Sequence, residues 1–322
     1  MVLNTPTDPD VTVIGGGPSG SATATLLAQK GLKVELFERD HFPRFHIGES
    51  LIPHTYHVLK RLGMLPKMRE SHFTHKHSVQ FVTEHGKLSE PFYFHDHEEE
   101  EWSQTWQVRR AEFDHMLLTN AREHGVTVHE GARVLEVLFE GTRAVGIRVK
   151  PEGQPERIVK AKVIVDASGQ SSLIIDKLNL REWDPELKKA AVWTYWKGAY
   201  RDEGKDAGAT IVLQTKDKAG WFWYIPLHDD IISVGASAAY RASQAAGLVV
   251  SVDSGWLAST CLAAVSRSQA RFLAGSPIQV VRLPSTQEPV CIEGAGKLAV
   301  AGNASVNSET VTSLIVSSSL KV

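Results

Sequence analysis

The feature that most constrains the fold is a set of three glycines near the N-terminus, spaced as G-x-G-x-x-G: Gly15, Gly17 and Gly20. The apolar run Val11–Ile14 precedes them, and an Ala- and Leu-rich stretch that we expect to form a helix over Ser19–Lys30 follows. A second apolar run, Val34–Phe37, then ends in the acidic residue Glu38. This order of strand, glycine turn, helix and acid-terminated strand predicts a βαβ unit that binds a dinucleotide.

Each glycine has its own physical role in such a unit. Gly15 permits the tight turn, Gly17 lets the backbone approach a pyrophosphate, and Gly20 allows close packing of helix on strand. The first amides of the helix have no partner inside it, so we expect them to bind the pyrophosphate. Glu38 closes the second strand, where its carboxylate can accept hydrogen bonds from ribose hydroxyls.

The segment after Glu38 indicates which dinucleotide is bound. Residues 39–50 contain a proline and a glycine, which predicts a loop of defined conformation and not a helix. In NAD dehydrogenases, by contrast, the acidic residue at the end of the second strand leads into the next helix. The string FPRFHIGESLIP, residues 42–53, resembles the flavin-dependent halogenases, a branch of the p-hydroxybenzoate hydroxylase-type FAD oxidoreductases. An ordinary surface loop is the competing interpretation. The resemblance implies FAD as the cofactor and assigns five residues of this loop to its site: Arg39, Arg44, Gly48, Glu49 and Ser50.

Two later motifs match the same family. We expect the segment Trp106–Asp114 to open a helix, in which Arg110 occupies the position of the family's arginine near the flavin pyrophosphate or ribitol. A solvated residue at a helix start is the alternative for Arg110. The apolar run Val163–Val165 leads into a turn, Asp166 to Gly169, that resembles the family's Asp-Ala-Thr-Gly turn beneath the cofactor. The resemblance therefore adds Arg110, Asp166 and Gly169 to the cofactor site.

The heptapeptide GWFWYIP, residues 220–226, matches the halogenase signature G-W-x-W-x-I-P at every fixed position. Alternation along a strand places Trp221 and Trp223 on one face. By the resemblance, these indoles separate the flavin pocket from the substrate pocket, which favours halogenation over direct hydroxylation. Ordinary core packing in an antiparallel sheet is their alternative role.

Lys76 lies in the segment His72–Phe81 and aligns with the lysine that holds hypohalous acid, or is halogenated by it, in the halogenases. A confined, partly apolar site lowers the pKa of an amine and increases its nucleophilicity. A lysine flanked by histidines is also typical of a solvated strand end. The resemblance implies that Lys76 is catalytic, together with Trp221 and Trp223.

The C-terminal part departs from the family. Leu298–Ala304 resembles the strand that runs into Gly-Asp-Ala, and Gly302 and Asn303 take the matching cofactor positions, with an amide in place of the carboxylate. The proline and glycine of the family's following Pro-x-Ser-x-Gly stretch are absent from residues 305–322. Most members continue for another large segment, so truncation, a disturbed reading frame and natural divergence all remain open. The resemblance is firm over residues 10–235.

Composition bears on partners and location. The formal net charge is −2 and no basic patch is evident, so no nucleic-acid partner is expected. Two cysteines are too few for a disulfide framework and suit the cytoplasm. Residues 1–10 do not resemble a signal peptide, and no apolar run reaches membrane-spanning length. His95-Asp96-His97 lacks the spacing of a zinc site and is expected in a solvated loop, so no metal is predicted.

The predicted fold class is α/β. A Rossmann-like FAD-binding domain, residues 1–78, 106–180 and an incomplete 290–322, is expected beside a discontinuous antiparallel-sheet substrate domain, residues 79–105 and 181–289. Alternation predicts a hairpin over Ala132–Val149 that turns at Glu140-Gly141. It also predicts four strands in the substrate domain: Val192–Trp196, Thr210–Gln214, Trp221–Ile225 and Ile231–Gly235.

The sequence thus predicts an FAD-dependent, halogenase-like oxidoreductase. By the resemblance it uses reduced FAD, oxygen and halide to halogenate an aromatic or other electron-rich small molecule, and a flavin reductase supplies the reduced flavin. A flavin monooxygenase or a geranylgeranyl-reductase-like enzyme, in which Lys76 has no catalytic part, is the alternative. The altered C-terminal motif motivates a third hypothesis, an FAD-binding remnant without turnover.

Overall fold

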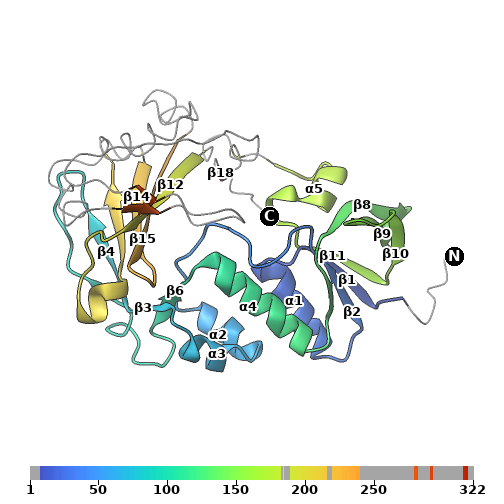
Figure 1. Ribbon diagram of the computed structural model, residues 1–322, viewed down its shortest axis with the longest axis horizontal. Coiled ribbons are helices and arrows are strands. Elements are labelled where there is room, and N and C mark those ends of the chain that lie inside the picture. The colour runs from blue at the N-terminus through green and yellow to red at the C-terminus, as the bar shows by residue number, and fades with distance from the viewer. Residues whose placement is uncertain are drawn as a thin grey trace. The chain divides into compact units, whose positions relative to one another are not determined.

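The computed structural model divides the chain into two compact units, whose elements are labelled in Figure 1. The structure describes these residues: 8–182, 184, 189–215, 220–239, 279–281, 291–292 and 315–317. The first unit consists of Met1–Ile47, Tyr56–Ser71 and Arg109–Arg181. The second consists of Gly48–Thr55, His72–Val108 and Glu182–Val322.

This division differs from the predicted domains over three short segments and at one boundary residue. Residues 48–55, 72–78 and 106–108 group with the second unit, although the sequence placed them in the cofactor domain, and Arg181 groups with the first. The predicted return of 290–322 to that domain falls mainly on residues outside the described ones. Among the described residues, no helix is both long and apolar enough to cross a membrane.

A parallel four-stranded sheet forms the centre of the first unit, in the order β11-β1-β2-β7. Its strands are short, and the two central ones are mostly buried, as expected of strands that are covered on both sides. Their bounds are β1 Val11–Ile14, β2 Val34–Phe37, β7 Thr127–His129 and β11 Val163–Asp166. The expected βαβ unit is present, because α1, Pro18–Ala28, connects β1 to the parallel strand β2.

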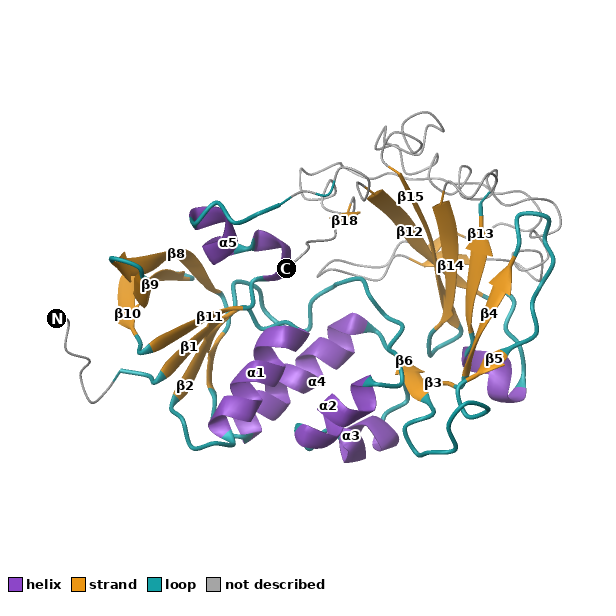
Figure 2. Cartoon of the chain, turned by 180° about the vertical axis from the view of Figure 1, so that it is seen from behind, coloured by secondary structure: helices purple, strands orange, loops and turns teal. Residues whose placement is uncertain are grey.

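Helices cover one face of this sheet and a second sheet covers the other (Figure 2). Strand alternation divides β1 between the two layers, because Val13 packs with Leu118 on the helix side and Ile14 packs with Val137 on the other. The helix side consists of α1 and α4, Arg110–Glu123, which lie side by side. The sheet side consists of β8 Ala132–Glu140, β9 Arg143–Pro151 and β10 Arg157–Lys160.

The predicted hairpin is confirmed in β8 and β9, which pair antiparallel on either side of Gly141. Gly141 has a φ of 59°, the left-handed conformation that such a turn requires. The remaining helices of the first unit are short: α2 Thr55–Arg61, α3 Leu65–Glu70, η1 Gly169–Ser171 and α5 Leu173–Lys177.

A nine-stranded sheet dominates the second unit among the described residues, in the order β17-β16-β12-β15-β14-β13-β4-β5, with β18 beside β12. Four of its strands contain the four predicted ones: β12 Lys189–Lys197, β13 Thr210–Gln214, β14 Gly220–Pro226 and β15 Ile231–Ala239. The others are β4 Ser78–Val82, β5 Phe92–Tyr93, β16 Gln279–Val281, β17 Cys291–Ile292 and β18 Ile315–Ser317. One face of the sheet buries a cluster that includes Trp196, Phe222 and Tyr224.

A two-stranded ribbon, β3 Thr74–Lys76 and β6 Thr105–Gln107, lies beside the 3₁₀ helix η2, Gly204–Gly208. The sequence predicted that the stretch from Trp106 onward opens a helix, but Trp106 pairs in β6 with His75. The helix begins only at Arg110, because Arg109 still has an extended ψ of 117°.

Candidate functional site

The glycine loop between β1 and α1 shows why two of its glycines are required by packing. Gly15 has a φ of +99°, and a Cβ there would lie 2.4 Å from the backbone oxygen of Ala167. A Cβ on Gly20 would lie 1.9 Å from the backbone oxygen of Gly15, so no side chain fits. Both positions therefore need glycine for the fold itself.

Gly17 differs, because the protein leaves space in front of it. A Cβ at this position would meet only Arg44 Nη2, at an ordinary contact distance of 3.5 Å. The N-terminus of α1 has no side-chain cap and no acidic residue in its first turn. An uncapped helix N-terminus beside an open glycine suits the pyrophosphate of a dinucleotide, so the loop fits FAD.

Glu38 binds the glycine loop to the end of β2. Its Oε2 accepts a hydrogen bond from the Gly16 amide at 2.6 Å, and its Oε1 accepts one from the Asp40 amide at 2.9 Å. A carboxylate has further lone pairs, so these bonds are compatible with the predicted ribose contact. Arg39, the next predicted residue, turns its exposed side chain toward Asp40, at 3.5 Å.

Two predicted arginines meet at a buried carboxylate that the sequence reasoning did not select. Arg110 forms a bidentate pair with Asp114, with distances of 2.7 and 3.0 Å, and donates a third bond to the Ile47 carbonyl at 2.6 Å. Arg44 approaches the same carboxylate at 3.1 Å. Asp114 is fully buried. The four-residue spacing of Arg110 and Asp114 on one helix was the available sequence signal, whereas nothing in the sequence linked Arg44 to them.

The Asp166–Gly169 turn lies beside the glycine loop, because Asp166 pairs with Ile14 across two parallel strands. The Asp166 carboxylate is used locally, since it accepts from the Ser168 amide at 3.0 Å and from the Ile174 amide at 2.8 Å. Gly169 adopts a φ of 61° at the end of the turn. The Asp166 carboxylate therefore helps to fix the turn and the start of α5, and its predicted contact with the cofactor stays a prediction. Gly302 and Asn303 lie outside the described residues.

In the second unit, Lys76 is buried, with 4% of its surface exposed, so it is not a solvated strand end. Its Nζ donates hydrogen bonds to Ser50 Oγ at 2.9 Å and to the Leu51 carbonyl at 3.2 Å. The same nitrogen lies 5.5 Å from the centre of the Phe94 ring. Burial lowers the pKa of Lys76 to about 8, because desolvation disfavours the ammonium.

The loop residues Gly48 to Ser50 are held within the second unit. The buried Glu49 accepts a hydrogen bond from the Tyr195 hydroxyl at 2.6 Å, and its carbonyl accepts one from the Val108 amide at 2.7 Å. Gly48, with a φ of 104°, allows the chain to turn into this segment. Tyr195 lies 146 residues from Glu49, and no local pattern predicted the contact.

The two signature indoles share one face of β14, as predicted. The rings of Trp221 and Trp223 lie 5.8 Å apart, with an angle of 53° between their planes. Trp223 is 9% exposed and donates to Ser233 Oγ at 3.2 Å, whereas Trp221 is 41% exposed. Gly235 lies opposite Trp223, and a Cβ there would come within 2.1 Å of the indole. The sequence reasoning missed Gly235, which provides the space for this ring.

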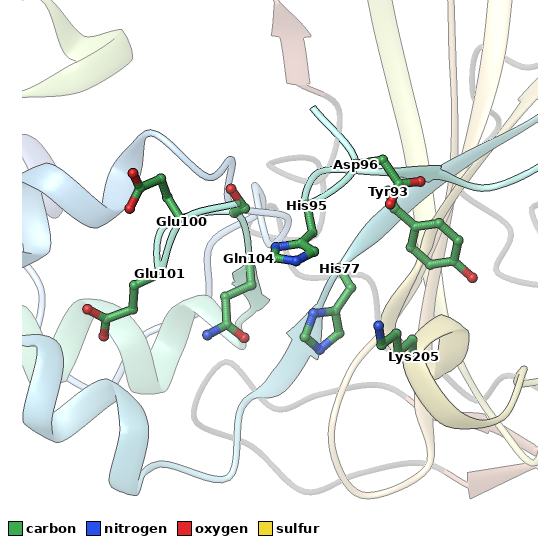
Figure 3. Close-up of a pocket in the computed structure, with 9 residues that line it drawn as sticks. His77, Tyr93, His95, Asp96, Glu100, Glu101, Gln104 and Lys205 are labelled. Atoms are coloured by element: carbon green, nitrogen blue, oxygen red, sulfur yellow. The ribbon is translucent and has the colours of Figure 1, made fainter. Parts of the chain in front are cut away.

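A separate pocket of about 530 Å³ lies in the second unit (Figure 3). His77 and His95 point into it, with Asp96, Glu100 and Lys205 around them. Lys76 does not line this pocket, because alternation along β3 and beyond directs its side chain away from that of His77. The predicted solvated loop is confirmed for residues 95–97, all of which are exposed.

The chain belongs to a family of FAD-binding domains, because residues 8–219 match the family described as "FAD binding domain". Flavin-dependent halogenase armH2 of Armillaria mellea is 36% identical over 241 residues, which are 73% of this chain and 46% of that protein. Tryptophan 2-halogenase of Chondromyces crocatus is 35% identical over 235 residues, which are 72% and 44%. The solved myxobacterial chondrochloren halogenase CndH matches with a TM-score of 0.76 and 34% identity, over 89% of this chain and 64% of that one.

These comparisons confirm three predictions: the relationship to flavin-dependent halogenases, FAD as the cofactor, and the fold class. The chain spans about half the length of the curated relatives it matches.

Proposed function

We propose that this chain carries the cofactor-binding and lysine-bearing part of a flavin-dependent halogenase that acts on an aromatic or other electron-rich small molecule. The observation that carries the proposal is the buried amine of Lys76. Neutral groups hold this amine by hydrogen bonds, and burial lowers its pKa. A lysine in a surface ion pair would have neither property.

The residues proposed to hold FAD are those of the glycine loop, with Glu38, Arg44 and Arg110 around it. The open position at Gly17 and the α1 N-terminus are the proposed pyrophosphate site. When bound and reduced, the flavin would activate oxygen so that halide is oxidised to hypohalous acid. A flavin reductase is the proposed source of the reduced flavin, and the cytoplasm the proposed compartment.

Lys76 is the proposed acceptor of the halogen. An amine with a pKa of about 8 is about one-tenth neutral at pH 7, whereas an ordinary lysine is neutral in less than about one molecule per thousand. The neutral nitrogen attacks the halogen of hypohalous acid, so an N–halogen bond forms and the halogen–oxygen bond breaks. The departing hydroxide takes the amine proton and leaves as water. The substrate carbon then attacks this halogen, so a carbon–halogen bond forms as the N–halogen bond breaks, and the proton that the substrate carbon loses returns to the lysine nitrogen.

Trp221 and Trp223 are proposed to wall off the substrate, because two rings on one strand face form a continuous apolar surface. The relative from Chondromyces crocatus is a tryptophan 2-halogenase, and tryptophan has an aromatic ring. We therefore propose aromatic rings rich in electrons, such as indoles, phenols and pyrroles, as the substrates to test.

The test supplies the purified chain with reduced FAD, oxygen, bromide and a panel of indole, phenol and pyrrole compounds. Mass spectrometry should detect a brominated product, and Lys76→Ala should remove it while the dissociation constant for FAD stays unchanged. Lys197→Ala, which changes an exposed lysine of the same unit, is the matched control and should retain the product.

Three results would contradict the proposal. Hydroxylated product that forms without halide would indicate a monooxygenase. FAD binding with no product from any compound would indicate a remnant without turnover. Full bromination by Lys76→Ala would show that the lysine is not the acceptor.

A further inference from the structure

The amine of Lys76 is the end of a chain of buried polar side chains. Ser50 Oγ, which accepts from Lys76 Nζ, lies 2.9 Å from Thr210 Oγ1. Thr210 Oγ1 in turn accepts from Gln107 Nε2 at 2.8 Å. Lys76, Thr210 and Gln107 are all buried. Four residues from four segments of the second unit therefore form one continuous hydrogen-bonded series.

The far end of this series is fixed by backbone. Gln107 Nε2 also donates to the Gly208 carbonyl at 2.9 Å, and a carbonyl only accepts, so the amide nitrogen must face it. Gly208 itself is pressed against β3, because a Cβ there would lie 1.8 Å from the His75 carbonyl oxygen. Gly208, whose carbonyl holds the Gln107 amide, therefore contacts β3, the strand that carries Lys76.

The middle of the series is fixed by two strands. Thr210 begins β13, which pairs in parallel with β4, and its register partner is Val79. Ser50 forms an isolated bridge with Gln107 on β6. The backbone of Ser50 is therefore held by β6, and its hydroxyl oxygen is held by the side chain of Thr210 on β13. This leaves Ser50 Oγ little freedom to move away from Lys76.

Every contact described for the amine is uncharged. A carboxylate beside Lys76 would also hold it in place, but would favour the ammonium over the nucleophilic amine. Two carboxylates on neighbouring segments have other hydrogen-bond donors: Glu49 Oε1 accepts from the Tyr195 hydroxyl, and Asp206 accepts from the hydroxyls of Ser78 and Tyr93. Adjoining segments also carry His54 and His75, and the titratable groups that line the pocket of Figure 3 are His77, Tyr93, His95, Asp96, Glu100, Glu101 and Lys205.

We propose that Thr210 and Gln107 are positioning residues for the halogenation reaction, which hold the Lys76 amine in one place through Ser50 and use uncharged groups alone. The assignment rests on the proposed role of Lys76 and extends it. Neither residue touches the reacting atoms. Their effect is on the orientation of the nucleophile, and misplacement of a reacting group by about 1 Å can slow a reaction about a hundredfold.

The first readout needs no flavin. In the full chain with ¹³Cε-labelled lysine, the Lys76 signal is assigned by its loss in Lys76→Arg. A fixed side chain gives its two Hε protons different chemical shifts. We expect this difference in the unmodified chain and its collapse in Thr210→Val, which keeps the shape of the side chain but removes the hydroxyl. Thr210→Ser, which restores a hydroxyl, should recover it, and Gln107→Leu should reduce it.

The matched control is Thr105→Val. Thr105 is a buried threonine on β6 whose hydroxyl bonds to the Ile52 carbonyl at 3.3 Å and not to Ser50. Its variant should retain the Hε shift difference. Thermal unfolding of each variant identifies any loss of fold.

The second readout is turnover. In Thr210→Val we expect kcat for bromination to fall about tenfold or more, with the substrate KM and FAD affinity unchanged, and Thr210→Ser to recover most of it. A folded Thr210→Val with an unchanged Hε pattern would overturn the proposal, as would a collapse in Thr105→Val or in Thr210→Ser. If the NMR results hold but the unmodified chain does not halogenate, Thr210 and Gln107 still hold the Lys76 amine in place, whereas the proposed function, and with it their role in halogenation, fails.

Discussion

Asp114→Asn tests whether the buried carboxylate of Asp114 holds Arg44 and Arg110, two of the residues proposed to bind FAD, in position. In the native chain this carboxylate receives three hydrogen bonds from two arginine side chains, Arg44 and Arg110. The amide of asparagine keeps the shape but has one oxygen, which leaves part of each guanidinium without its partner. It also removes the negative charge between two positive ones.

The expected loss is large because of where the group lies. Asp114 has no exposed surface, and the side chains of Arg44 and Arg110 are only 16% and 12% exposed. Removing one partner from a buried ion pair costs about 3–5 kcal/mol, because the remaining charge stays buried. Arg110 keeps its bond to the Ile47 carbonyl, so we expect a loss near the lower limit, about 3 kcal/mol.

Urea unfolding followed by circular dichroism measures this loss, and FAD titration of the folded variant measures the effect on the cofactor site. The matched control is Asp176→Asn. Asp176 makes a bidentate pair with Arg181 at 2.7 and 3.0 Å, nearly the geometry of Asp114 with Arg110, but its carboxylate is 52% exposed. Water replaces the lost contact there, so the free energy of unfolding should hardly change.

Equal losses in the two variants would refute the reasoning, because burial is the property that distinguishes them. So would an Asp114→Asn variant as stable as the native chain. A variant that is less stable, yet binds FAD as tightly as the native chain, would place Asp114 in the fold alone.

Three further predictions concern the glycines and Lys76. Gly17→Ala should keep its melting temperature but weaken FAD binding in a fluorescence titration, whereas Gly20→Ala should lose the fold, because its Cβ overlaps backbone. Gly235→Ala should displace the Trp223 indole and alter the near-ultraviolet circular dichroism; an unchanged spectrum would contradict this. Because burial lowers the pKa of Lys76 from 10.5 to about 8, the unfolded chain binds more protons between these values. Stability should therefore rise relative to Lys76→Met as the pH increases from about 8 to 10.5, and parallel curves would refute this.

The sequence by itself determined the features that depend on neighbours along the chain. The glycine spacing at Gly15 and Gly20 predicted the βαβ turn, because close backbone approach admits no side chain at either position. Alternation predicted the hairpin of β8 and β9, the main strands of the second unit, and the common face of Trp221 and Trp223. These properties repeat every two to four residues and can be read locally.

Only the tertiary structure decided which polar groups meet. Arg44 lies 70 residues from Asp114, Glu49 lies 146 residues from Tyr195, and Ser50 lies 160 residues from Thr210. A hydrogen bond between distant segments depends on the order of the strands and the path of the loops. It therefore produces no repeating residue pattern in either segment from which it could be predicted. The same holds for Lys76, which the resemblance selected but whose burial comes from packing in the second unit. Local spacing thus determined where backbone can approach backbone, and tertiary packing decided which side chains lose water and which partners they find.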